Sequence, residues 1–231
     1  MVAYRSSTIT TYASRTNTVA TAPTGIADGD ALFLFVIEVA TSPPAITPPS
    51  GFSLLPNFPY TLVVGTYSVK TSAFVKIASG ESGSYTITHA STISQAYLAA
   101  FSAPAFTPFS PNPTVNSATG GPNTTTMLGL TTTTNNSLVM TISQDWGDTT
   151  NNLTPPSGST PTFTERGDAS ILEVADGILA TAGATGNKTM TNNCYNNNTN
   201  SGWSGFMFAM PAFTAPQPFT IQQAVNRSYT Y

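Results

Sequence analysis

The sequence predicts an all-β protein: an antiparallel, jelly-roll-like β-sandwich built from two related halves and followed by an extended C-terminal arm. Only 7% of its 231 residues are charged, against about 25% in typical soluble domains, and Thr, Ser and Asn take their place. Threonine is β-branched, and Ser and Asn compete for backbone hydrogen bonds, so the composition favours strands and turns over helices. The 17 Gly and 18 Pro add frequent chain breaks.

The motif Thr-Pro-Pro-Ser-Gly occurs twice, at residues 47–51 and 154–158. Its two prolines hold an extended backbone, and the Ser-Gly pair allows a tight turn before the next strand. The segments around the two copies also follow one another in the same order, which indicates repeated supersecondary structure. The expected sandwich therefore spans residues 1–212, with related halves at about 1–105 and 113–212.

Short apolar and alternating segments mark the strands of the first half. Residues 4–21 predict one or two edge strands. The near-continuous apolar run at 31–40 predicts a strand that is buried on both faces. Residues 67–77 alternate and predict a half-buried antiparallel strand. The segment at 84–88 then returns as a separate strand, and 95–101 forms the last strand of this half.

The second half repeats this order. Residues 104–122, rich in Pro, Ser and Asn, predict a connection between the halves, and 136–140 matches the start of the first buried strand. Residues 168–182 carry apolar side chains at helical spacing, but Gly177 weakens a helix and the repeat places a strand there, so a strand is favoured. The segment at 203–210 matches the last strand of the first half.

The arm at 213–231 follows the sandwich. One interpretation is a disordered terminus. The other is an arm that orders against a neighbouring subunit, because it carries large apolar and aromatic side chains that could be buried there. These candidate assembly contacts are Phe213, Phe219, Ile221, Val225, Tyr229 and Tyr231.

Charge and cysteine content exclude several classes of function. The net charge is -3, and the seven Lys and Arg residues are scattered, so neither a nucleic-acid partner nor a polybasic membrane anchor is expected. The apolar run at 31–39 contains Glu38 and is too short to cross a bilayer. The N-terminal residues lack the apolar core of a signal peptide, so no secretion is expected.

The residues that could carry catalysis do not form a recognisable constellation. His89 and Cys194 are the only residues of their kinds, and neither has a flanking partner that would activate it, so both are interpreted as structural. No cofactor and no metal site is predicted. The pairs Asp28/Asp30 and Asp145/Asp148 could be oxygen-rich calcium loops, but ordinary turn chemistry is favoured.

Two other groups of residues are candidate sites. Trp146 and Tyr195, with the Asn-rich run at 192–200, could form a platform for sugar stacking, whereas Trp203 is expected in a core strand. A hydrolase would need two carboxylates to meet in a cleft. The candidates for such a pair are Asp145, Asp148, Glu165, Asp168 and Glu173, and a non-enzymatic role is favoured over this hypothesis.

The turn and strand motifs together resemble a group of tail- and capsid-associated β-sandwich proteins of tailed bacteriophages and prophages. The motifs that carry the resemblance are residues 27–32, 47–52, 76–81 and 85–88 in the first half, and 155–158, 164–166 and 182–186 in the second. The chain departs from the pattern at Ser159, where an aromatic residue is expected, and in the C-terminal arm.

The resemblance implies a virion structural or adhesive role without catalytic residues. The first expectation is a capsid decoration or head-fibre protein in the virion, assembled in the host cytoplasm. It would contact other virion proteins, such as the major capsid or tail proteins, and form a homo-oligomer, for example a trimer. The alternative is a tail-fibre or receptor-binding module that recognises host-surface glycans through Trp146 and Tyr195.

Overall fold

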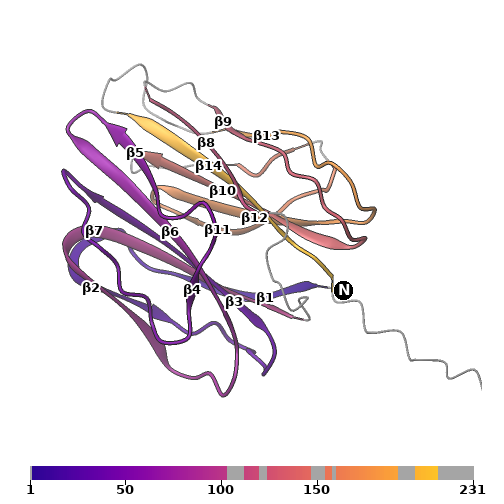
Figure 1. Cartoon of the computed structure of the whole chain (residues 1–231), viewed down its shortest axis with the longest axis horizontal. Helices are drawn as coiled ribbons and strands as arrows, with labels where there is room; N and C mark the ends of the chain where they lie inside the picture. The colour runs from indigo at the N-terminus through magenta and orange to yellow at the C-terminus, as the bar shows by residue number, and fades with distance from the viewer. Residues whose placement is uncertain are drawn as a thin grey trace, which may run out of the picture.

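The computed structural model describes residues 2–102, 112–119, 124–146, 154–157, 160–191 and 201–212. Within these ranges all regular structure is β, in fourteen strands that pair only in antiparallel fashion (Figure 1). This confirms the predicted all-β, antiparallel class, and no described segment is a long apolar helix that could cross a membrane. Several of the residues named in the sequence analysis lie outside these ranges. They are Asp148, Ser159, Cys194 and Tyr195, together with the arm and its candidate contacts Phe213, Phe219, Ile221, Val225, Tyr229 and Tyr231.

The first sheet contains the seven strands of residues 3–102. They are β1 (Ala3–Ile9), β2 (Ala13–Thr21), β3 (Ala31–Ala40), β4 (Ser53–Leu54), β5 (Tyr60–Val64), β6 (Tyr67–Ile77) and β7 (Ser84–Ser102). Their order is β1-β7-β3-β6-β4, with β2 also paired to β7 and β5 also paired to β6. The central strand β3 therefore lies between the two longest strands, and its side chains alternate between two apolar clusters, one on each face of the sheet, so both faces are buried.

The second sheet has the order β11-β12-β10-β14-β8. Its strands are β8 (Thr114–Thr119), β10 (Ser137–Trp146), β11 (Thr164–Ala169), β12 (Leu172–Leu179) and β14 (Gly202–Met210). A separate two-stranded sheet pairs β9 (Thr124–Met127) with β13 (Lys188–Thr191). β9 approaches the second sheet through Thr125, which accepts a hydrogen bond from Ser143 of β10 at 2.9 Å.

The two halves pair their strands in the same way. β3 lies between β6 and β7, and β10 lies between β12 and β14; both central strands have ten residues, nine of them buried. The Thr of each Pro-Pro motif also forms the same isolated bridge, Thr47 with Thr88 and Thr154 with Thr191. Its backbone N–H donates across 2.9 Å in the first half and 3.4 Å in the second. Each motif therefore fastens its loop to the equivalent returning strand.

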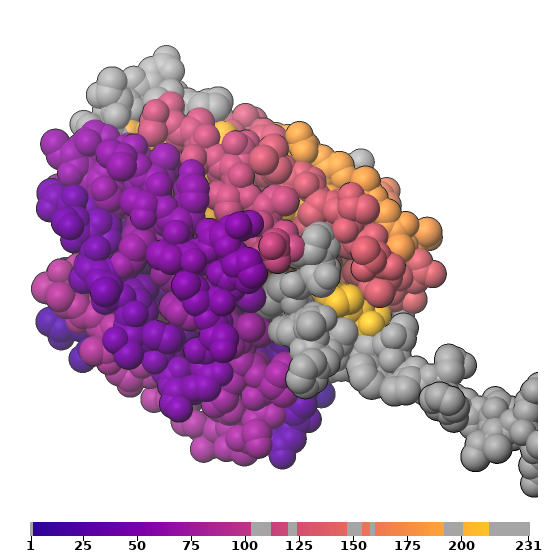
Figure 2. All heavy atoms as spheres, viewed as in Figure 1, coloured from indigo at the N-terminus to yellow at the C-terminus, as the bar shows by residue number. Residues whose placement is uncertain are grey.

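The two sheets face one another across an aromatic core. Phe33 and Phe35 of β3 meet Phe208 and Phe206 of β14, with ring centroids 5.0 and 5.3 Å apart in edge-to-face geometry. Each half of the chain keeps to its own side of the molecule (Figure 2).

Both ends of the described chain belong to this core. Val2 is fully buried and Ala212 is 8% exposed, and both belong to the same apolar cluster as the four Phe rings. The start of β1 and the end of β14 lie near each other at one end of the molecule (Figure 1).

Several residues of the sequence motifs contact one another in a compact cluster on the first sheet. Lys76 Nζ lies 2.7 Å from Glu81 Oε1, Tyr85 donates to Glu81 Oε2 at 2.6 Å, and the Lys76 ammonium lies about 6 Å from the rings of Phe52 and Tyr85. Burial would raise the pKa of Glu81, but the hydrogen bonds from Lys76, Tyr85 and the Ser79 amide outweigh it and lower this pKa. The Lys76 side chain thus links Glu81 in the 79–83 turn to Phe52, the residue that follows the first proline motif.

Three predictions of local structure were wrong. Residues 84–88 and 95–101 are not separate strands but parts of β7, a continuous strand of 19 residues. β6 is not simply half-buried, because Ser72 and Phe74 on its outer face are also covered. The expected connection at 104–122 contains strand β8. The choice of strand at 168–182 was correct for β12, and a turn at 170–171 separates it from β11.

Candidate functional site

Three carboxylates of β11 and β12 form the densest group of potential ligands in the described structure, and we call Glu165, Asp168 and Glu173 the acidic cluster. One oxygen from each residue lies within 4.8 Å of the others. The antiparallel register places Asp168 directly opposite Glu173. Residues three apart on a regular strand point to opposite faces, but a bulge between Glu165 and Gly167 shifts the register and places Glu165 beside Asp168.

Glu173 is the buried member of the acidic cluster. Its side chain is fully buried, and neither of its carboxylate oxygens has a hydrogen-bond partner among the described residues. Burial, followed by the charges of Glu165 and Asp168, raises the pKa of Glu173 to about 9. Burial and Glu165 also raise the pKa of Asp168. Because Glu165 and Asp168 are exposed, the cluster is open to solvent on one side.

No basic side chain in the described ranges compensates this charge. Arg166, between two members of the cluster, points to the opposite face of β11, where its Nε and Nη2 lie 2.9 and 2.8 Å from Asp176 Oδ1. Its guanidinium also covers the ring of Tyr4 of the first sheet at 4.3 Å. The other ion pairs of the described residues join Arg5, Lys70 and Lys76 to other carboxylates.

The acidic cluster contains three of the five carboxylates named for a hydrolase. Asp145 lies on β10 and is 1% exposed, and Asp148 lies outside the described residues. Two carboxylates that cleave a glycosidic bond stand about 5–9.5 Å apart, with the sugar between them. The oxygens of the cluster are closer together than this and lie on one hairpin. The arrangement is therefore better suited to holding a small ion than to flanking a sugar.

A second group consists of the aromatic side chains Tyr12, Tyr67 and Trp146, which we call the aromatic cluster. The Trp146 ring lies 5.7 Å from Tyr67 and 6.3 Å from Tyr12, measured between centroids. Trp146 is partly buried, and Tyr67 is 42% exposed. Trp146 thus has an exposed aromatic neighbour that the sequence does not predict, because Tyr67 at the start of β6 and Tyr12 in the β1–β2 loop are both distant from it in the sequence.

The remaining candidate residues lie in structural positions. Trp203 is 4% exposed in β14, in the core strand expected from the sequence. His89 is 6% exposed, with Nε2 bonded to Thr18 Oγ1 at 2.9 Å and Nδ1 to the Ala90 carbonyl oxygen at 2.8 Å. These partners hold the imidazole on both nitrogens, which fits a structural role.

The Asp28/Asp30 pair completes turns. Asp28 accepts a hydrogen bond from the Gly80 amide at 2.7 Å, so it ties its loop to the connection between β6 and β7. Asp30 accepts from the Ala27 amide at 2.7 Å and lies 2.6 Å from Arg5 Nε. The two side chains therefore serve separate contacts, as turn chemistry predicts.

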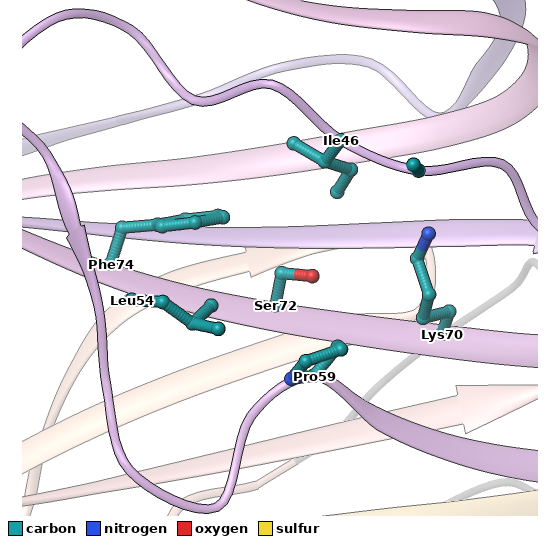
Figure 3. Close-up of a pocket in the computed structure, with 7 residues that line it drawn as sticks. Ile46, Leu54, Pro59, Lys70, Ser72 and Phe74 are labelled. Carbon is teal, nitrogen blue, oxygen red and sulfur yellow. The ribbon is translucent and has the colours of Figure 1, made fainter.

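A small pocket opens on the outer face of the first sheet, between β6 and the loop that carries Ile46 (Figure 3). Its volume is about 200 Å³, below the range of about 300–1,000 Å³ that is usual for small-molecule sites. Lys70 on its wall is already 2.7 Å from the fully buried Glu38. Burial raises the pKa of Glu38, and the contact with Lys70 opposes this shift. The pocket therefore offers no free charge to a ligand.

The chain was compared with family models, curated proteins and solved structures, and none of them matches it. The functional assignment consequently depends on the sequence motifs and on the two clusters described above.

Proposed function

We propose that the chain is a non-catalytic structural protein of a bacteriophage virion, most simply a capsid decoration or head-fibre protein that acts by packing between subunits. The observation that supports this most is the repeated strand pairing, in which both proline motifs fasten equivalent loops through Thr47–Thr88 and Thr154–Thr191. These motifs carry the resemblance to phage β-sandwich proteins. The low charge and the Thr- and Asn-rich composition fit a rigid particle component.

The repeat also supports a finer description of the fold. We infer one jelly-roll-like sandwich whose halves derive from a duplicated unit, with β3 and β10 in equivalent central positions. Both strands have ten residues, of which the first nine are buried and the last is partly buried. A duplicated unit explains this agreement without a separate cause for each strand.

Assembly is proposed to use the C-terminal arm. Ala212 packs in the shared core, so the arm continues from a fixed point of the body. Its apolar residues, Phe213, Phe219, Ile221, Val225, Tyr229 and Tyr231, would bury surface on a neighbouring copy, for example in a trimer, or on a capsid or tail protein. Nothing in this proposal requires nucleic acid or a membrane.

Removing the arm is expected to abolish self-association. Light scattering should give an oligomer for the full chain and a monomer for a chain that ends at Ala212. Because Ala212 keeps its place in the core, the shortened chain should retain the same melting temperature. If both chains have the same mass, the arm is not the element that joins copies, and the proposed mode of assembly is wrong.

A tail-fibre or receptor-binding module for host-surface glycans is the second candidate. The aromatic cluster favours it, because Tyr67 is exposed beside Trp146 and sugars stack on such rings. On an array of bacterial surface glycans, Tyr67→Ala should bind about tenfold more weakly than the parent chain, a loss of about 1.4 kcal/mol. Val63→Ala, on the same hairpin and 63% exposed, is the matched control. Absence of binding by the parent chain would remove this candidate.

A further inference from the structure

We propose that the acidic cluster of Glu165, Asp168 and Glu173 binds a hard divalent cation of the Ca²⁺ class. The sequence predicts no metal site here, and a role as a virion component does not require one. The proposal depends on three carboxylates that converge within 4.8 Å and on the absence of any hydrogen-bond partner in the described structure for the buried one, Glu173.

The environment of Glu173 indicates a bound ligand even apart from the convergence of the three carboxylates. A fully buried carboxylate normally has hydrogen bonds or an ion pair, because an unpaired buried charge is costly. Glu173 has neither among the described residues, and its cross-strand neighbour Asp168 is another acid. The basic residue nearest in sequence, Arg166, is held on the opposite face by Asp176. A cation bound between the three carboxylates would supply the missing positive charge.

The ligand atoms of the acidic cluster determine which kind of ion it can bind. All three side chains offer oxygen only, the ligand that Ca²⁺ prefers, whereas zinc sites in proteins generally include His or Cys. Ca²⁺ takes 6–8 oxygens at about 2.3–2.6 Å, so two of its ligands stand at most about 5 Å apart. The 4.8 Å limit within the cluster fits that spacing. Glu165 and Asp168 are exposed, so water can complete the coordination.

The position of the cluster indicates what the ion would do. β11 is an edge strand whose only strand partner in the described structure is β12. Glu165 and Asp168 come from β11, and Glu173 comes from β12. A cation would therefore join the edge strand to its neighbour on both sides of the bulge at 165–167 and hold the bulge in place. The expected effect is a more stable second sheet.

The test uses the full chain, freed of metal with EDTA and then titrated with CaCl₂ in a scanning calorimeter. At a calcium concentration about a hundredfold above Kd, the melting temperature should rise by about 5–10 °C. Glu173→Gln keeps the shape of the side chain and removes the carboxylate that would bind the ion. It should therefore fold at least as well as the parent chain without metal, and it should lose the calcium-dependent shift.

Asp28→Asn is the matched control. Asp28 is a turn carboxylate in the other half, and Asn preserves the oxygen that accepts from Gly80. This variant should keep the full calcium shift, and Asp168→Asn should lose it as Glu173→Gln does. The proposal is overturned if the parent chain shows no shift up to about 10 mM Ca²⁺, beyond the weakest known extracellular sites. It is equally overturned if the shift persists in both Glu173→Gln and Asp168→Asn.

Discussion

Phe206→Ala is expected to lower the free energy of unfolding by about 3–5 kcal/mol. The Phe206 ring is fully buried between the two sheets, with its centroid 5.3 Å from that of Phe35 and 5.5 Å from that of Phe58. Removing it takes away apolar contacts from both sheets and leaves a cavity that rigid strands cannot fill. Urea denaturation, followed by both fluorescence and circular dichroism, measures the loss.

The same experiment tests whether the two sheets form one cooperative unit. Because Phe35 and Phe206 belong to different sheets, a single transition should shift as a whole, with coincident curves for the two probes. Val63→Ala is the control, since this side chain is 63% exposed and its truncation should change the stability by at most about 0.5 kcal/mol. Two separate transitions, of which only one moves, would contradict a single sandwich.

Gly177→Ala is expected to cost about 3 kcal/mol, at the upper end of the penalties for overpacking. A Cβ at Gly177 would clash with the carbonyl oxygen of Thr162 and would lie 3.1 Å from Pro161 Cβ. The first contact is with backbone, which cannot rotate away as a side chain can. The variant should show a lower urea midpoint, because the segment before β11 must move off the sheet.

Gly25→Ala separates steric conflict from backbone conformation. Gly25 has φ +71° and nothing within 4 Å of an added Cβ, so its substitution should cost only the penalty of about 1–2 kcal/mol for a left-handed alanine. Gly177 carries no such φ, so its larger cost would come from crowding alone. Equal or smaller losses at Gly177 would mean that the close approach to Thr162 is not maintained in solution.

The sequence predicts the strands well where a short apolar run is bounded by turns. The runs that form β3 and β10 are of this kind, and their length suits a strand that is buried on both faces. At β7 the polar segment between residues 88 and 95 suggested a break. The strand nevertheless continues, because β2 pairs with residues 84–88 and 92–94 on either side of a register shift and supplies backbone hydrogen bonds that side-chain polarity does not reveal. Pairing with distant strands thus overrides the local signal.

The sequence predicts the candidate sites less completely than it predicts the strands. Glu165, Asp168 and Glu173 could be named from the sequence as acids, but their convergence depends on a bulge, and a register shift of one residue leaves no mark in the spacing. Trp146 can be named from the sequence as a candidate aromatic contact, yet its neighbours Tyr12 and Tyr67 come from the other half of the chain. The residue types of a site are readable in such a chain, whereas the partners that complete it are set by long-range register.

Val2 and Ala212 are buried in one cluster, so the two ends of the molecule differ, and we call these ends its poles. β10 and β14 run antiparallel, so Leu138 and Met210 mark the pole where both described ends lie. Trp146, paired with Gly202, marks the other pole, about 25–30 Å away along the strand. The aromatic cluster, which includes Trp146, therefore lies at the pole opposite the one that holds Val2 and Ala212. Under the proposed virion role, a copy attached at the first pole would present this cluster away from the particle.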